Sequence, residues 1–346
     1  MKKKQTKDAY AGAGVNIDAG HEAVKRMKNY VRLARTKNVV NDLGAFGGLF
    51  SLPKNYKQPI LVSSTDGVGT KVMLASKMNK YDTVGQDLVN HCVNDILVQG
   101  AKPLFFMDYF ATGKLKPRVA AEIVKGLAKA CRENQCALLG GETAEMPGIY
   151  RGDDFDLAGT IVGIVEKKQI IDGKKIKPGD VVIGLASNGL HTNGYSLARK
   201  ILFTQLKLKL SSFIPDLSNK IGEELLRVHR SYLSVILDLL KIDAIRGLAH
   251  ITGGGLLDNI PRILPSKCGV VIQKNAWKIP TIFKYLKAAG KVDPNTMYRT
   301  FNMGIGMVLI VAASKVNKVM LKLKTSREKA YIIGEVKVGP RKVKIV

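Results

Sequence analysis

Glycine-rich loops at the ends of predicted strands carry the residues of this chain that could do chemistry. In the loop STDGVGTK, at 64–71, an apolar and β-branched run ends in Asp66. The positions after it are residue types that bind phosphate, namely Gly67, Gly69, Thr70 and Lys71. Glycine amides can approach a ligand closely, an ammonium suits phosphate, and a strand-end carboxylate suits Mg²⁺. The alternative is a hairpin turn with an exposed Asp and Lys.

A second candidate carboxylate lies on a segment of helical periodicity, TVGQDLVNHCVNDILVQG at 83–100. Asp95 falls on or beside the inward face of this segment, where a carboxylate needs a cation, a donor or a metal. A structural Asp that caps a neighbouring loop would meet the same need. Asp87, His91 and Asp95 are spaced four apart and so could resemble a row of metal ligands on one face of a helix. We interpret His91 as a bystander, because Mg²⁺ takes oxygen ligands.

Two more loops combine glycines with polar side chains. GGETAEMPG, at 140–148, carries Glu142, Thr143 and Glu145 in a chain rich in cations, although Glu145 could pair with a surface Lys. The loop at 187–199, SNGLHTNGYSLAR, surrounds the start of a predicted helix, which favours anions. Its candidate ligand-binding residues are His191, Asn193, Ser196 and Arg199.

The loop HITGGG, at 250–255, places His250 at a strand end, followed by Thr252 and Gly253. A single His is more often structural than catalytic, so acid/base, ligand-contact and structural roles all stay open for His250. Neither common nucleotide fingerprint is present, since the chain has no GxxxxGK[ST] and no GxGxxG between a strand and a helix.

Alternating strand and helix patterns must position these loops, which predicts an α/β or α+β fold. The stretch EKKQIIDGKKIKPGD at 166–180 has no periodicity and is the best boundary, giving domains 1–168 and 169–346. Predicted strands lie at 59–65, 103–111, 136–143, 157–166, 181–187, 247–252, 269–273, 304–313 and 330–336. Predicted helices lie at 83–100, 117–134, 193–203, 279–290 and 315–324, with two more near 219–241.

Composition narrows the class of protein. The formal net charge is +27, but 41 of the 55 cations are Lys and only 14 are Arg. Nucleic-acid recognition relies on the planar guanidinium, so we interpret the charge as a lysine-rich solvated surface and expect no nucleic-acid partner. Four cysteines without CxxC spacing indicate free thiols in a reducing cytoplasm. We expect no signal peptide, because no apolar stretch follows the basic N-terminus, and no membrane span.

Taken together, the motifs carry a family resemblance. In order and spacing, the chain resembles the phosphoribosylformylglycinamidine cyclo-ligase (aminoimidazole ribonucleotide synthetase) family from about Tyr10 to about Val336. The motifs are TDGVGTK, DILVQGAKPLFFMDYFATGK, GGETAEMPG, HTNGYSLARK, HITGGGLLDNIPRILP and FNMGIGM. The part from Asp95 to Pro103 is a signature shared with other ATP-using relatives, such as thiamine-phosphate kinase and selenophosphate synthetase. GGETAEMPG and HTNGYSLARK together point to the cyclo-ligase.

The resemblance implies an ATP-dependent ligase of de novo purine biosynthesis. Its reaction closes the imidazole ring of formylglycinamidine ribonucleotide by forming a C–N bond. Phosphorylation of the formyl oxygen by ATP makes that oxygen a leaving group, so the protein's work is positioning and charge neutralisation. Another phosphotransferase of the superfamily, acting on a different small molecule, is the enzyme alternative. A nucleic-acid-associated protein is the alternative from another class.

The resemblance also implies roles for particular residues. Asp66 and Asp95 would hold Mg²⁺, and Lys71 with the loop amides would bind phosphate. His250 is the acid/base candidate, because imidazole titrates near neutrality. The residues implied near ATP are Asp18, Lys28, Gly47, Asp66, Gly67, Gly69, Thr70 and Lys71. Those implied at the ribonucleotide are Glu142, Thr143, His191, Asn193, Ser196, Arg199, Thr252 and Gly253.

The implied architecture has two domains and two copies of the chain. An N-terminal ATP-binding domain would contribute a mixed sheet to a barrel across a homodimer interface, and a C-terminal α/β domain would cover the active cleft. The chain departs from the family at four positions. Ala11 and Asn16 stand where members often have Lys and Asp, and Val228 and His229 precede Arg230 where members commonly have Pro-Thr.

Overall fold

The computed structural model describes residues 13–42 and 44–346, which form two compact units. Unit 1 comprises the described part of Met1–Lys54 with Thr65–Cys92 and Leu104–Ile161. Unit 2 comprises Asn55–Ser64, Val93–Pro103 and Val162–Val346. Tyr10, Ala11 and Leu43, which the resemblance includes, lie outside the described residues.

The first sheet has four strands in the order β1-β4-β2-β3. They are β1 (Pro59–Gly67), β2 (Lys102–Thr112), β3 (Ala137–Glu145) and β4 (Phe155–Glu166). β2 and β3 run parallel, which pairs Tyr109 with Glu142. The helices of this part are α2 (Ile17–Leu33), α3 (Val72–Lys77), α4 (Asp82–Leu97) and α5 (Pro117–Glu133). The boundary between the units falls within β1, β2, β4 and α4.

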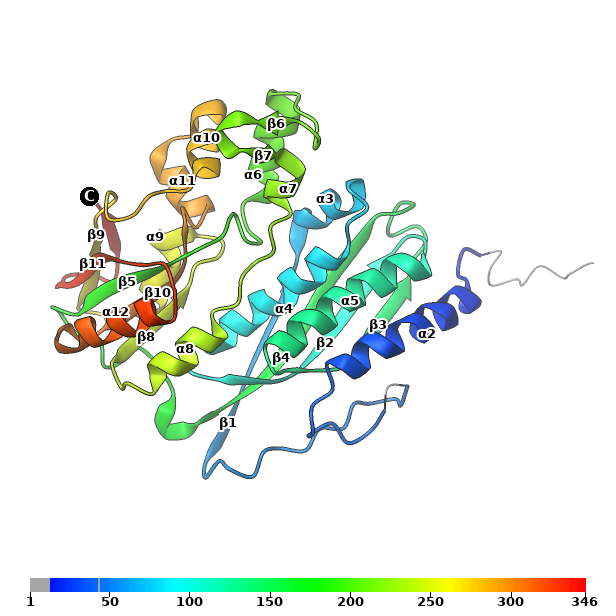
Figure 1. The fold of residues 1–346 in the computed structure, drawn as a ribbon, viewed down its shortest axis with the longest axis horizontal. Helices are drawn as coiled ribbons and strands as arrows, with labels where there is room; N and C mark the ends of the chain where they lie inside the picture. The colour runs from blue at the N-terminus through cyan, green and yellow to red at the C-terminus, as the bar shows by residue number, and fades with distance from the viewer. Residues whose placement is uncertain (1–12, 43) are drawn as a thin grey trace, which may run out of the picture. The chain divides into compact units, whose positions relative to one another are not determined.

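Helices α2 and α5 lie side by side in unit 1 (Figure 1). Asn16 caps α2 by accepting a hydrogen bond from the Ala19 amide at 3.1 Å. Helices α4 and α5 approach so closely that glycines are required where they meet. A Cβ at Gly85 would overlap the carbonyl oxygen of Ile123, and a Cβ at Gly126 would overlap that of Asp82.

The second sheet has six strands in the order β12-β9-β11-β5-β10-β8. The strands are β5 (Val181–Ala186), β8 (Ile245–His250), β9 (Cys268–Ile272), β10 (Ile305–Val311), β11 (Ala330–Val338) and β12 (Val343–Ile345). All seven residues of β10 are buried, as expected for an apolar strand with neighbours on both sides. His250 is the last residue of β8 and pairs with Met307 of β10.

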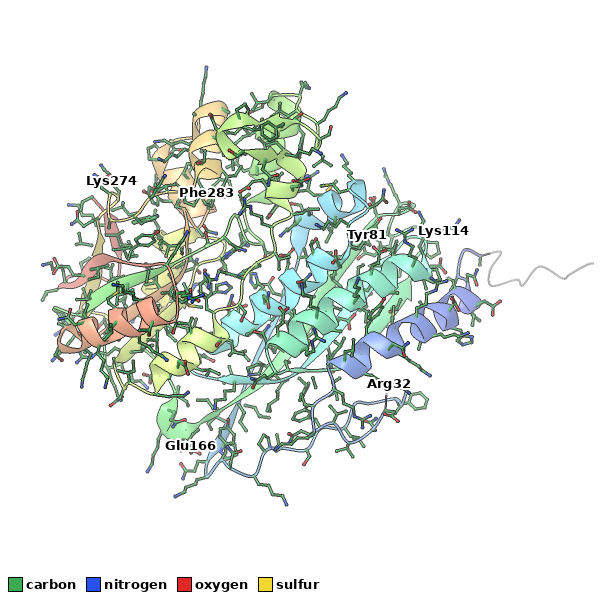
Figure 2. All side chains as sticks on the ribbon, viewed as in Figure 1. Arg32, Tyr81, Lys114, Glu166, Lys274 and Phe283 are labelled. Carbon is green, nitrogen blue, oxygen red and sulfur yellow. The ribbon has the colours of Figure 1, made fainter. Side chains whose placement is uncertain are left out.

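Short helices complete unit 2. They are α6 (Tyr195–Arg199), α7 (Ile221–Leu225), α8 (Leu233–Leu240), α9 (Gly255–Asn259), α10 (Thr281–Gly290), α11 (Pro294–Thr300) and α12 (Val316–Thr325). A π-helical turn, Lys200–Gln205, continues α6, and a small hairpin joins β6 (Phe213–Ile214) to β7 (Asn219–Lys220). Phe283 of α10 packs on Phe301, with ring centroids 5.8 Å apart. Charged side chains lie at the surface of both units, for example Lys114 in unit 1 and Lys274 in unit 2 (Figure 2).

The mixed α/β character with two units confirms the expected fold class. The lysine-rich helix at the C-terminal end buries Val316, Val319 and Leu323, as its periodicity predicted, while Met320 is only partly buried. None of the helices in the described ranges combines the length and apolarity that a membrane span needs.

Candidate active site

Asp66, near the end of β1, is held through both carboxylate oxygens. Oδ1 accepts a hydrogen bond from the Gly67 amide at 2.7 Å, and Oδ2 lies 2.7 Å from Nε2 of the buried His91. His91 therefore has a function that the sequence analysis did not assign to it, because it orients Asp66. Gly69, with a φ of 65°, opens the short 3-10 turn Gly69–Lys71.

Lys71, which the sequence analysis predicted to bind phosphate, is not the exposed Lys of the alternative hairpin turn. Its side chain is fully buried, and Nζ lies 2.7 Å from Oδ2 of Asp87, which is fully buried as well. Burial lowers the pKa of Lys71, and the charge of Asp87 opposes part of that shift. The ammonium thus anchors the loop to α4.

Asp95 and His250 form a directly bonded pair in unit 2. Oδ1 of Asp95 lies 2.8 Å from Nδ1 of His250, and Oδ2 accepts a hydrogen bond from the Ser64 hydroxyl at 3.1 Å. The Asp95 side chain is 24% exposed, whereas that of His250 is 3% exposed. Asp95 is therefore the member of the pair that a ligand can reach, and His250 supports it from the interior.

His250 continues into a buried cluster of imidazoles. Its Nε2 lies 3.1 Å from Nε2 of His229, whose Nδ1 is 2.7 Å from the Thr192 hydroxyl. His191 stacks on His229, with ring centroids 4.1 Å apart. Both ring nitrogens of His250 thus have protein partners.

The two ligand-binding loops predicted in unit 2 meet each other. The side-chain nitrogen Nδ2 of Asn193 lies 3.7 Å from the point where a Cβ on Gly253 would be. Asn259 holds the glycine loop by donating to the carbonyl oxygen of Gly253 at 3.1 Å. Asn193 and Arg199 are partly exposed and Ser196 is exposed, so their side chains are available to a ligand. His191 is buried instead and adopts a φ of 64°.

The predicted residues of β3 belong to unit 1. Glu142 is exposed, and Thr143 is partly buried. Burial raises the pKa of Asp108 to about 7, and the charge of Glu142 adds to the shift. Glu145 binds backbone amides rather than a surface Lys, because it accepts hydrogen bonds from Leu115 at 2.7 Å and from Asn16 at 2.6 Å.

Lys28 lines a small basic cavity of unit 1. Its volume is about 160 Å³, and its polar and charged lining residues are Lys28, Arg32, Arg35, Asn41 and Asp42. Asn41 also donates to the carbonyl oxygen of Gly47 at 2.8 Å, which ties the predicted glycine segment to this cavity. Asp18 is exposed in the first turn of α2.

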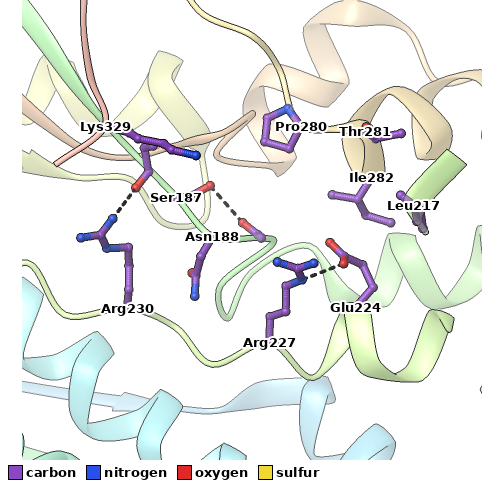
Figure 3. A pocket seen from close by; sticks show the side chains of 12 residues that line it. Ser187, Asn188, Leu217, Glu224, Arg227, Arg230, Pro280, Thr281, Ile282 and Lys329 are labelled. Carbon is purple, nitrogen blue, oxygen red and sulfur yellow. Dashed lines mark hydrogen bonds and ion pairs between the residues drawn. The ribbon is translucent and has the colours of Figure 1, made fainter. Parts of the chain in front are cut away.

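A larger cavity lies within unit 2, beside the loop that follows β5 (Figure 3). Its volume is about 460 Å³, and its charged lining residues are Glu224, Arg227, Arg230 and Lys329. Arg227 pairs with Glu224 at 2.7 Å, and Arg230 pairs with Glu328 at 2.8 Å. Three cations against one lining carboxylate make the cavity suited to an anionic group.

Sequence reasoning missed His229, Asn94 and Asp87 as members of the site. The signals available were weak. His229 was noted only as a departure from the family, and Asp87 only as part of a spacing pattern. Asn94 and His229 stand 135 positions apart in the chain, so no local pattern connects them.

Comparisons with known proteins identify the fold and the family. Residues 53–165 match the family model described as AIR synthase related protein, N-terminal domain, and residues 177–346 match the corresponding C-terminal domain. Among solved structures, a thiamine-monophosphate kinase from Stenotrophomonas maltophilia K279a superposes with a TM-score of 0.66 at 16% identity, covering 94% of this chain and 95% of that one. Hydrogenase maturation protein HypE in complex with ATP also gives 0.66, at 18% identity over 94% and 90% of the two chains.

Curated relatives are much more similar in sequence. A phosphoribosylformylglycinamidine cyclo-ligase of Thermoanaerobacter sp. (strain X514) is 54% identical over 94% of this chain and 97% of its own. Another, from Citrifermentans bemidjiense, is 52% identical over 96% of both chains. The expected aminoimidazole ribonucleotide synthetase-like fold is confirmed, and the chain belongs to the phosphoribosylformylglycinamidine cyclo-ligase family.

Proposed function

We propose that this chain closes formylglycinamidine ribonucleotide to aminoimidazole ribonucleotide, using ATP and releasing ADP and phosphate, in de novo purine biosynthesis. The observation that carries the proposal is the pair of Asp95 and His250, joined at 2.8 Å beside the glycine loop that begins at Thr252. Ring closure removes a proton from the attacking nitrogen, and a carboxylate backed by a buried imidazole can accept it.

The loop after β1 fits a bound nucleotide. ATP supplies the phosphoryl group that turns the formyl oxygen into a leaving group. The Gly69 amide and the Thr70 hydroxyl would bind phosphate oxygens, and the predicted contact from the Gly67 amide would require that amide to turn from Asp66 to the ligand. Asp66, and in unit 2 Asp95, are carboxylates, the oxygen donors that Mg²⁺ prefers, and each is a candidate ligand. The basic cavity at Lys28 offers a further anion site.

The joined loops of unit 2 would bind the ribonucleotide. Asn193, Ser196, Arg199, Thr252 and Gly253 offer donors for its phosphate and ribose. Glu142 and Thr143 would bind polar groups of the substrate. Since His191 is buried under His229, we assign it to the support of the imidazole cluster.

We also propose a cytoplasmic homodimer. The four cysteines are free and buried, which fits a reducing compartment. Met107 and Tyr109 of β2 are each 39% exposed although both are large and apolar, so the open face of the first sheet is suited to a second copy of the chain.

The test is an assay of the purified chain with formylglycinamidine ribonucleotide and Mg-ATP. We expect equal amounts of ADP and aminoimidazole ribonucleotide. Asp95→Asn and His250→Gln should each lower kcat by roughly 10²–10⁴-fold, and Asp66→Asn should change the Mg²⁺ dependence. Asp238→Asn, an acid paired with Lys241 on the surface, is the control and should leave activity unchanged. Turnover of thiamine phosphate without imidazole formation would reassign the chain.

A further inference from the structure

We infer that His229 is a positioning residue that fixes the ring of His250 and the hydrogen on its Nε2. The effect of His229 on kcat rests on the proposed function, whereas the positions of its ring hydrogens do not. The assignment follows from the partners of Asn94, His229 and His250, all of which belong to unit 2. It states which ring nitrogens of His229 and His250 carry hydrogens and how the ring of His250 is oriented toward Asp95.

The orientation of the Asn94 side chain is fixed by two backbone groups. Its Oδ1 accepts from the Tyr232 amide at 3.0 Å, and its Nδ2 donates to the carbonyl oxygen of Arg230 at 3.0 Å. A backbone amide only donates and a carbonyl only accepts, so the two ends of the Asn94 amide cannot be exchanged. Its second amide hydrogen then points to Nε2 of His229, which is 3.2 Å away.

This orientation assigns the tautomer of His229. An Nε2 that receives a hydrogen from Asn94 is an acceptor, so the ring hydrogen is on Nδ1. Nδ1 has the matching acceptor, the Thr192 hydroxyl at 2.7 Å. This tautomer satisfies both the contact of Nε2 with Asn94 and the contact of Nδ1 with Thr192.

The same assignment sets the hydrogen between the two imidazoles. Nε2 of His229 carries none, so the hydrogen of the 3.1 Å contact belongs to Nε2 of His250. Nδ1 of His250 is then left facing Oδ1 of Asp95 at 2.8 Å, and this contact is where the pair can take up one proton. His229 thus keeps the Nδ1 edge of His250 directed at Asp95.

The backbone around His229 is held firmly enough to act as a support, although 227–232 is neither helix nor strand. The carbonyl oxygen of Val228 accepts from Asn188 at 2.7 Å. Arg230 donates to Glu328 through one nitrogen at 2.8 and 2.9 Å, and it also donates to the carbonyl oxygen of Ala186. His229 itself is 0% exposed.

The structural part is tested by NMR on the full chain labelled with ¹⁵N-histidine. The chain has only 5 histidines, so each ring can be assigned by substitution. We expect long-range ¹H–¹⁵N correlations to show the Nδ1–H tautomer for His229. An Nε2–H tautomer would overturn the inference, whatever reaction the protein catalyses.

The kinetic part compares two substitutions of one side chain. His229→Leu fills the space without an acceptor and should lower kcat about 10–100-fold, because small misplacements of a catalytic group have costs of this size, while KM changes little. His229→Gln can place an amide oxygen near the former Nε2 and should restore most of kcat. A wild-type kcat in His229→Leu, or equal losses in both variants together with equally lowered melting temperatures, would overturn the inference.

Two controls separate this result from other failures. Trp277→Phe removes a buried hydrogen bond of unit 2, from Nε1 to the Met303 carbonyl oxygen at 2.9 Å, without touching the histidines. It should lower the melting temperature and leave kcat unchanged. If the wild-type chain makes no aminoimidazole ribonucleotide, the proposed function fails while the tautomer measurement still decides the role of His229.

Discussion

Each of the two carboxylates predicted to bind Mg²⁺ is bonded to a histidine. Asp66 lies 2.7 Å from His91, and Asp95 lies 2.8 Å from His250. The hydrogen bonds orient the carboxylates before any ligand binds, which reduces the reorganisation that binding would otherwise require. At the scale of single residues, each carboxylate is therefore held in place by a histidine.

The ion pair of Lys71 and Asp87 makes the loop after β1 sensitive to single substitutions. Lys71→Met should lower the free energy of unfolding by about 3–5 kcal/mol, because it leaves a buried carboxylate without its cation. The double variant Lys71→Met/Asp87→Leu should recover much of this loss. Urea unfolding of the three proteins gives the measurement.

The exposed pair of Lys241 and Asp238 supplies the control for that prediction. Lys241→Met should change the free energy of unfolding by less than about 1 kcal/mol. If Lys71→Met unfolds at the same urea concentration as the wild type, the buried pair does not stabilise the loop.

The residue types of the site could be predicted from sequence, but their pairings could not. Asp66, Asp95 and His250 stand out because glycines and strand ends surround them. Lys71 has the same local signal as a phosphate ligand, and only the position of α4 shows that its partner is Asp87. Hydrogen-bond partners depend on which elements meet in space, and neighbouring residues do not encode that information.

At the scale of elements, the contact between α4 and α5 depends on glycine. Gly85→Ala and Gly126→Ala should each lower the free energy of unfolding by about 1–3 kcal/mol, because the new methyl group overlaps backbone of the facing helix. Thermal and urea unfolding measure the effect.

Helix α2 contains the matched control. A Cβ at Gly20 meets nothing within 4 Å. Gly20→Ala should therefore raise the free energy of unfolding by up to about 1 kcal/mol through helix propensity. Stabilisation by all three substitutions would show that α4 and α5 can separate at no cost.

Most elements followed from periodicity, and the exceptions have a physical cause. The strand at 304–313 and the helix at 315–324 appear as β10 and α12 with small shifts at their ends. Helix α2 escaped notice because it buries only Ala23 and Met27, so its apolar stripe is narrow. The short β6–β7 hairpin has too few residues for a periodic signal.

At the scale of the whole molecule, the net charge of +27 opposes the proposed dimer. Two such chains repel each other, and salt screens the repulsion with a Debye length of about 10 Å at 0.1 M. We expect light scattering to give twice 37.7 kDa at moderate salt and a growing monomer fraction at low salt.

Substitutions on the open sheet face test where the two copies meet. Met107→Lys and Tyr109→Lys add charge at the apolar face and should shift the protein towards monomer at every salt concentration. Lys274→Glu, which changes the charge of an exposed residue of unit 2, is the control and should not shift the protein towards monomer. A monomer at all salt concentrations in the wild type would contradict the dimer.

The irregular segment 227–232 has a consequence for how this enzyme can evolve. Its path is held through backbone groups, namely the carbonyl oxygens of Val228 and Arg230 and the amide of Tyr232. These groups are the same whatever side chains the segment carries. A single codon change at 229 can therefore exchange the chemistry beside His250 while the chain keeps its course, so natural variation in this segment reaches the candidate active site directly.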